Sequence, residues 1–380
     1  MEKSVFEFFF PRKIAVIMLV FCCIFLLSLT AAAGESETDF FQLCKEGSSE
    51  EITQAIEEGA DVNQTDQKGA TPLMYAAAQN TDFRVILLLR QSGARFNYRD
   101  DDGETALFYV VKYNRNTYIV ELLTHLGANV NIINRDGENA LIQAVKRERE
   151  DVVKILLRAG INVDVVDEDE RTALMHAVEE DNIDIMEMIL DAGANLHKTN
   201  AEGQTVLMLA VKHGREQMVE FLLKKGAVVT QEDKEGRPPL LYAARYHHPE
   251  IMKMILDSRA LVNAADNMDR NALYYLFKYS RHDTMYLLDI LLDNKIDVNN
   301  PDMEGKTPLM YAARYSEDPA VIRKLIEAGA NLNAIDKYKG MTPLMFAARY
   351  NENEQVIFEL LEAGADPAAR DELKKKVVDY

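Results

Sequence analysis

Four basic residues, each followed directly by a tyrosine, recur in the C-terminal part of this 380-residue chain. The pairs, which we call the ladder, follow one another at steps of 33, 36 and 35 residues. They are Arg245-Tyr246, Lys278-Tyr279, Arg314-Tyr315 and Arg349-Tyr350. Guanidinium and ammonium groups pair with carboxylates, and tyrosine and arginine often dominate the energy of protein interfaces. These residue types therefore predict the recognition of acidic groups on a partner.

Residues that could catalyse a reaction or hold a metal are scattered along the chain. The adjacent pair His247-His248 stands in an expected solvated turn, where two neighbouring side chains make a poor metal site without further ligands. Acidic runs such as 167–170 are typical of exposed turns, whereas acid–base catalysis needs carboxylates that converge in a sheltered pocket. The sequence contains no phosphate-binding loop, Cys-x-x-Cys or His-Glu-x-x-His. We therefore predict a protein that is not an enzyme and that has no metal and no cofactor.

The spacing of the ladder follows a repeat that runs through most of the chain. A tag similar to Gly-Ala-Asp-Val-Asn, as at residues 59–63, begins ten times at steps of 33 to 36 residues. A second tag, Thr-Pro-Leu or a variant of it, as at residues 71–73, keeps step with the first. Two tags in phase at a period of about 33 residues predict a stacked array of repeats.

Residues 70–97 show what one repeat should form. Thr71 can cap a helix, and Pro72 follows at the first helical position, where its missing N–H costs nothing. The apolar run at 85–89 predicts a second, longer helix, which Gly93 can end in the left-handed conformation. Each repeat should therefore contain a turn, a short helix, a reversal and a longer helix. One repeat cannot bury its apolar side alone, so the repeats must stack.

The match to a known family is dense at Thr71-Pro72-Leu73-Met74-Tyr75-Ala76-Ala77, at the copy 307–313 and at the tag 59–63. These segments closely resemble the ankyrin repeat, and the resemblance covers roughly residues 37–380. It implies an all-α solenoid of stacked antiparallel helix pairs with hairpin-like loops. It also implies that the ladder lies on the concave face, where ankyrin arrays bind protein partners. Stacking would set equivalent side chains about 10 Å apart, the usual separation of packed helices.

The ladder has a purely structural explanation as well. Its tyrosines could pack against the next repeat, and its cations could neutralise helix C-termini. The distribution favours binding, because the middle repeats place Arg147, Glu180 and His213 where the ladder has tyrosine, and the N-terminal half has only Lys112-Tyr113. A further aromatic residue stands four positions before each ladder tyrosine, which predicts an aromatic pair on each helix. These residues are Tyr242, Tyr275, Tyr311 and Phe346.

The array is expected to fill residues 34–380 with about ten repeats. We expect capping repeats at 37–63 and 371–380 and an irregular repeat at 260–295. In the irregular repeat Asp269 replaces the loop glycine and Asn271 replaces the capping threonine. This predicts a seam or bend near residues 270–295, unless the changes are simple drift.

Residues 1–33 differ from the rest of the chain. Arg12-Lys13 precede an apolar run that ends in small residues, a pattern typical of a secretory signal peptide. Cleavage after Ala33 would give an exported protein, and the compact leader favours a bacterial, periplasmic or secreted one. If it stays uncut, the stretch 14–33 is long enough to cross a bilayer, which would leave an inner-membrane-anchored structural scaffold.

The formal net charge of −19 limits the partners. A strongly negative chain repels nucleic acids and anionic membrane surfaces. We therefore expect a monomer that binds a protein partner and no nucleic acid, with membrane contact only through an uncleaved N-terminal segment. The regulation of a neighbouring enzyme stays open as an alternative.

Overall fold

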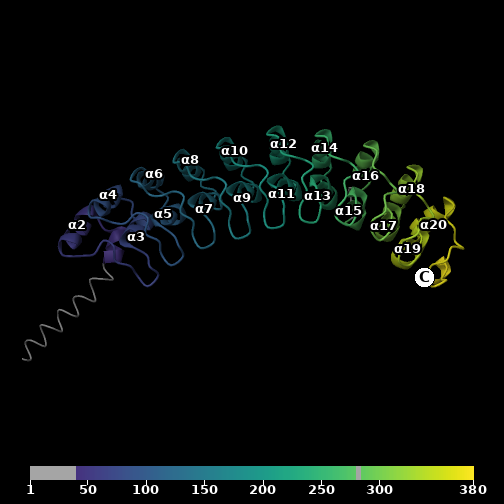
Figure 1. Cartoon of the computed structure of the whole chain (residues 1–380), viewed down its shortest axis with the longest axis horizontal. Helices are drawn as coiled ribbons and strands as arrows, with labels where there is room; N and C mark the ends of the chain where they lie inside the picture. Colours follow the sequence, from purple (N-terminus) through teal and green to yellow (C-terminus); the bar gives the residue numbers. More distant parts are fainter. Residues whose placement is uncertain (1–39, 280–283) are drawn as a thin grey trace, which may run out of the picture. The chain divides into compact units, whose positions relative to one another are not determined.

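The structure, a computed structural model, describes residues 40–279 and 284–380 (Figure 1). The expected signal peptide, residues 1–33, lies outside the described residues, so its cleavage stays a prediction. The chain divides into two compact units, and their boundary falls between Val165 and Val166. We refer to them as unit 1 and unit 2.

Unit 1 is built from pairs of short helices. Residues 40–46 are helical. The helices that follow are α2 (Ser49–Glu57), α3 (Pro72–Gln79), α4 (Phe83–Gln91), α5 (Ala106–Tyr113), α6 (Thr117–His125), α7 (Ala140–Val145) and α8 (Glu150–Arg158).

Unit 2 continues the same alternation and carries the whole ladder. Its helices are α9 (Ala173–Glu179), α10 (Ile183–Asp191), α11 (Val206–Lys212), α12 (Glu216–Lys224), α13 (Pro239–Tyr246), α14 (Pro249–Asp257), α15 (Ala272–Lys278), α16 (Thr284–Asp293), α17 (Pro308–Tyr315), α18 (Pro319–Glu327), α19 (Pro343–Tyr350) and α20 (Glu354–Glu362). A short 3₁₀ helix, η1 (Val377–Asp379), follows them.

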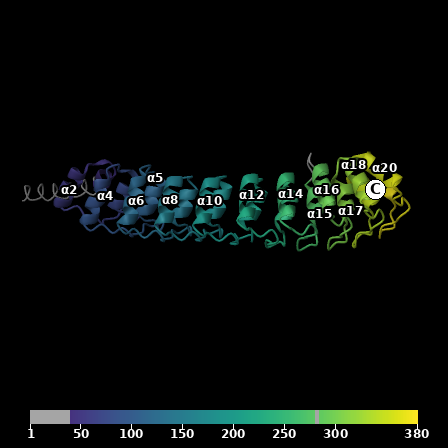
Figure 2. The same ribbon diagram turned by 90° about the horizontal axis from the view of Figure 1, so that it is seen from above.

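Within each unit the helices form two rows. The first helix of each repeat has an odd number and contacts the first helix of the next, as α13, α15, α17 and α19 do in unit 2. The second helices form the other row, and Figure 2 shows the loops of each unit along one side. The described residues contain isolated β-bridges but no strand. This confirms the predicted all-α stack of helix pairs with projecting loops.

The caps form as the repeat pattern predicts. The Thr71 hydroxyl accepts the backbone N–H of Met74, and Pro72 is the first residue of α3. Gly93 ends the second helix with a φ of 92°, a left-handed conformation that suits glycine. Arg259 and Lys295 take the same position with φ values of 67° and 64°, so these two repeats end their helices in the same way without glycine.

The core of unit 2 lies between the two helix rows, where Leu309, Val321 and Leu325 have no exposed surface. Neighbouring loops are joined through main-chain atoms. The Met303 N–H donates to the Met268 carbonyl at 3.0 Å, and the Lys337 N–H donates to the Glu304 carbonyl at 2.9 Å. Stacked helices and joined loops hold equivalent side chains of successive repeats in register, which is the condition for a ladder. The expected bend near 270–295 stays a prediction.

Candidate partner-binding ladder

The ladder lies where the first helices of four successive repeats end. Three of its pairs are the last two residues of α13, α17 and α19, and the fourth is the last residue of α15 with its C-cap, Tyr279. Lys278 and Arg349 are exposed, and the other six ladder residues are half-buried. The ladder side chains are therefore packed against the scaffold and still reach solvent.

The arginines of the ladder lie over tyrosine rings of two successive repeats. The Arg245 guanidinium carbon is 4.7 Å from the centre of the Tyr279 ring, one repeat further on. Arg314 lies 4.2 Å from the centre of Tyr350 in the same way. Each also lies over the tyrosine that follows it in sequence, at 5.5 Å for Arg245 and 4.9 Å for Arg314. The repeated contact fixes each guanidinium between two aromatic faces.

Lys278 departs from this arrangement. Its ammonium group donates a hydrogen bond to the Tyr274 hydroxyl at 2.7 Å and lies 5.7 Å from the centre of the Tyr279 ring. Tyr274 is only 5% exposed and packs edge-on against Tyr311 of the next repeat, with ring centres 4.7 Å apart. The contact between this repeat and the next is therefore made by the rings of Tyr274 and Tyr311 and not by the ammonium group of Lys278.

The expected aromatic pairs form on each of the four first helices. The rings of Tyr311 and Tyr315 are nearly parallel, at 4°, with centres 6.5 Å apart. The corresponding interplanar angles are 18° in α13, 13° in α15 and 37° in α19. In α13, α15 and α19 the first member of the pair is less accessible than the ladder tyrosine, since Tyr242, Tyr275 and Phe346 are 2%, 3% and 4% exposed, whereas Tyr311 of α17 is half-buried. In those three helices the first member supports the ladder tyrosine rather than offering a surface of its own.

The buried tyrosines are fixed by an aspartate nine residues earlier, a contact that we call the Asp–Tyr clamp. The Tyr242 hydroxyl donates to Asp233 at 2.6 Å, and the Tyr275 hydroxyl donates to Asp266 at 2.5 Å. Burial and the hydrogen bond to the carboxylate both raise the pKa of Tyr275, so the phenol stays protonated. The clamp ties the loop to the helix that carries the ladder in the repeats of α13, α15 and α17, whereas α19 has Phe346, which has no hydroxyl.

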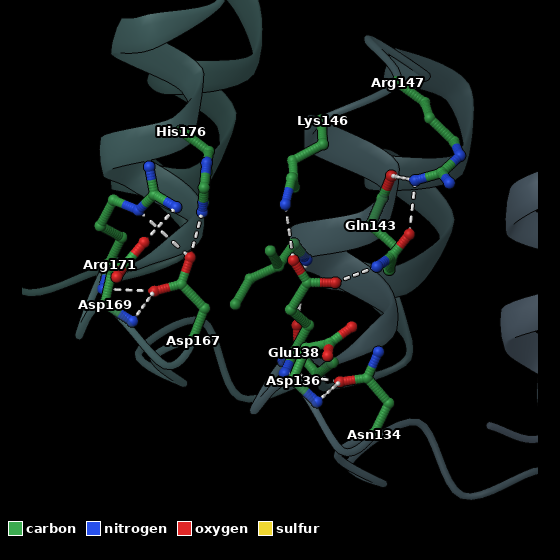
Figure 3. A network of polar contacts seen from close by, with 12 residues as sticks. Asn134, Asp136, Glu138, Gln143, Lys146, Arg147, Asp167, Asp169, Arg171 and His176 are labelled. Carbon is green, nitrogen blue, oxygen red and sulfur yellow. Dashed lines mark hydrogen bonds and ion pairs between the residues drawn. The ribbon is translucent and has the colours of Figure 1, made fainter. Parts of the chain in front are cut away.

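The clamp recurs in both units, although not in every repeat, and the sequence analysis missed it. Unit 1 has it between Tyr109 and Asp100, at 2.8 Å. In unit 2, His176 takes the place of the tyrosine, with its Nε2 2.8 Å from Asp167 (Figure 3). The available signal was an aspartate that precedes the first aromatic residue by nine positions in repeat after repeat.

The sequence analysis also missed a second feature, an internal ion pair that neutralises some of the basic residues at helix ends. In unit 1, Lys112 pairs with Glu104, eight residues before it, and Glu104 is only 5% exposed. Lys146 pairs with Glu138 at 2.7 Å over the same separation (Figure 3). The basic residues of unit 1 that correspond to the ladder therefore have internal carboxylates.

The ladder cations lack this internal carboxylate. The residues eight positions before them are Arg237, Arg270, Lys306 and Met341. Three of these are themselves basic and are paired with the loop carboxylates of Asp233, Asp266 and Glu304. Between residues 40 and 380, apart from 280–283, no carboxylate lies within ion-pair distance of a ladder cation. The ladder is a row of cations that contact aromatic rings and are not paired with a carboxylate in the part of the chain that the structure describes.

The expected turn at His247-His248 differs from the structure in one respect. His247 is only 6% exposed and has a φ of 60°, so it is buried in a left-handed position rather than solvated. In the part of the chain that the structure describes, no group of three or more His, Cys, Asp or Glu residues could hold a metal. Within those same ranges, no helix is both long and apolar enough to span a membrane.

Comparison with known proteins identifies the class of protein. The family model for ankyrin repeats (three copies) matches residues 40–134, 110–200, 192–266, 259–336 and 276–371. The chain therefore belongs to the ankyrin repeat family, which confirms the resemblance seen in the sequence. This is a non-catalytic binding family, and its repeats imply a protein partner in general. No curated protein matches the chain.

Proposed function

We propose that this protein is a binding module that recognises an acidic segment of a partner protein along the ladder. One observation carries the proposal: four successive repeats each present a cation that is paired with no carboxylate of residues 40–279 and 284–380, in a chain with 62 acidic and 43 basic residues. In unit 1, Glu104 neutralises Lys112. A carboxylate of the partner would do the same for Arg314.

The contacts of the ladder favour binding in a second way. Arg314 is already held between the rings of Tyr315 and Tyr350, so it loses little conformational freedom when a partner arrives. A guanidinium that stacks on aromatic faces still presents N–H groups suited to carboxylates. Charge-assisted hydrogen bonds of this kind contribute about 1.5–3 kcal/mol each.

The net charge of the chain favours a protein partner over a nucleic acid. The ladder cations stand in a chain of net charge −19, which repels a polyanion that carries a phosphate at every residue. A short acidic segment needs only a few carboxylates at the ladder, and the rest of such a partner can be neutral or basic.

The test is the binding of a fluorescein-labelled peptide of six Glu-Ser dipeptides, measured by anisotropy at low ionic strength. The double variant Arg314→Glu, Arg349→Glu should bind at least about tenfold more weakly, since two attractive contacts become repulsive. The matched control is Lys154→Glu, Arg158→Glu on α8, where both side chains are exposed and the charge change is the same. Equal weakening in both variants, or none in the ladder variant, contradicts the proposal.

We also propose that residues 1–33 direct export to the periplasm or the medium, as their signal-peptide pattern predicts. N-terminal sequencing of the protein from its native host tests this. A mature chain that begins at Gly34 supports export. A chain that retains the apolar stretch 14–33 favours the alternative, a scaffold tethered to the inner membrane.

A further inference from the structure

The ladder has a regular period set by helix packing. Its pairs lie at equivalent positions of α13, α15, α17 and α19, and each of these helices contacts the next. Packed helices are about 8–10 Å apart. From this packing we expect the cations of successive repeats at about this interval along unit 2.

A ligand that pairs with several of these cations must present carboxylates with the same interval and on one side. An extended strand does not, because side chains three residues apart point to opposite faces and those two apart are separated by only about 6.6 Å. A polyproline II helix does, because it has three residues per turn and rises about 9.3 Å per turn. Every third side chain of such a helix faces the same way.

The aromatic lining of the ladder suits the same conformation. Each of the four first helices places two rings next to the cation, and in α17 these rings are within 4° of parallel. Aromatic-lined grooves bind proline-rich segments, whose preformed polyproline II helix loses little entropy on docking. The face between the cations is thus suited to proline rings rather than to charged side chains.

We propose that the ladder binds a polyproline II segment that carries a carboxylate at every third residue, with one helical turn for each repeat. This inference rests on the proposed function and adds the conformation and register of the ligand. Arg245, Lys278, Arg314 and Arg349 would each meet one carboxylate, and the intervening prolines would lie against the tyrosines. Lys278 is the weakest position, since its ammonium group is already hydrogen-bonded to Tyr274.

The test uses the full chain and four labelled peptides with the same number of glutamates. The first has four Glu-Pro-Pro triplets. The second has the same composition with its glutamates at every second position, and the third has four Glu-Gly-Ser triplets, which keep the spacing without the polyproline II helix. The fourth is an alanine-rich helical peptide with a glutamate at every seventh residue, which gives a spacing of about 10.5 Å on one face.

We expect the Glu-Pro-Pro peptide to bind at least about tenfold more tightly than each of the others. The second peptide loses charge pairs, the third must be ordered on binding, and the helical peptide has no proline rings to lie against the tyrosines. Equal affinities for all four peptides would overturn the inferred polyproline II ligand and leave the recognition of acidic segments intact. Tighter binding of the helical peptide would also overturn the inferred polyproline II ligand. Failure of every peptide to bind would overturn both proposals.

A coupled substitution tests the register itself. In the Glu-Pro-Pro peptide, each glutamate is changed to glutamine in turn and tested against the wild type and against Arg314→Gln. Replacing one particular glutamate should weaken the affinity for the wild-type protein about tenfold. The same replacement should hardly change the affinity for Arg314→Gln, because the arginine that pairs with this glutamate is absent from the variant. If the four glutamates respond to Arg314→Gln alike, no fixed register exists and the inference is wrong.

Discussion

The Arg314 guanidinium carbon lies 4.2 Å from the centre of the Tyr350 ring, which belongs to the next repeat. Arg349 lies over the same ring at 5.2 Å. Tyr350 therefore contacts two cations and joins two repeats, and the ladder contributes to the stability of unit 2 as well as to its proposed surface.

Replacing Tyr350 by leucine removes the aromatic face under both arginines. We expect the free energy of unfolding to fall by about 1–3 kcal/mol, from two cation–π contacts of about 0.5–1 kcal/mol each and lost packing. Urea unfolding followed by circular dichroism measures this. Tyr350→Phe keeps the ring and should cost clearly less, and equal costs for the two variants would show that the rings do not hold the arginines.

The buried pair of Glu104 with Lys112 should stabilise unit 1. The side chains are only 6% and 17% exposed, so Glu104→Gln leaves a nearly buried ammonium group without its carboxylate. We expect a loss of about 1.5–3 kcal/mol. Glu121→Gln, at an exposed position of α6, is the control and should change little. Adding Lys112→Met to Glu104→Gln should restore part of the loss, and a further loss would contradict this explanation.

Lys306→Glu should give Arg314 an internal carboxylate. Residue 306 stands eight positions before Arg314, the separation at which Glu104 pairs with Lys112. We expect the affinity for the Glu-Ser peptide to fall by about tenfold, because the partner then competes with an internal carboxylate. Lys306→Gln removes the same lysine charge without adding a carboxylate, and a loss as large in this control would refute the competition.

Asp266 should make the stability of unit 2 depend on pH at the acid end. Burial alone would raise the pKa of Asp266, but hydrogen bonds from Arg270, Tyr275 and the backbone outweigh it and lower the pKa. Because the folded pKa lies below the value of about 3.9 in an unfolded chain, the stabilisation is present above about pH 4 and is lost as the pH falls through the folded pKa.

Asp266→Asn tests this by urea unfolding at about pH 7 and about pH 3. The wild type should be more stable than the variant at the higher pH, and the difference should shrink at the lower pH. Asp293→Asn, an exposed position on α16, should show neither effect. A difference for Asp266→Asn that is the same at both pH values would mean that the charge of Asp266 is not what stabilises the clamp.

Much of the fold could be predicted from the sequence, because each repeat carries its own start and stop signals. Thr71, Pro72 and Gly93 act within a few residues of their own positions, so periodicity alone places the helices. The neutralisation of Lys112 by Glu104 could not be predicted in this way. It requires the residue before the first helix to lie beside the end of that helix, a geometry that appears only once the turn and helix are folded.

The ladder illustrates the same limit. Its residues and their positions at helix ends follow from the repeat, but the sequence does not distinguish Lys278, which bonds to Tyr274, from the arginines that reach the next repeat. Several tyrosine rings lie near each ladder cation, and packing determines which of them the cation contacts. The register of the repeats is encoded locally, whereas the pairing of each cation is decided by its neighbours in the stack.

The most direct test of the central claim is the side-chain NMR spectrum of arginine-labelled protein during titration with the Glu-Ser peptide. We predict that the Nε–H signals of Arg245, Arg314 and Arg349 shift, because these guanidinium groups contact tyrosine rings and are paired with no carboxylate of the described residues. Those of Arg237 and Arg270, which are paired with Asp233 and Asp266, should stay in place. Shifts at Arg237 and Arg270 with none at the ladder arginines would contradict the account.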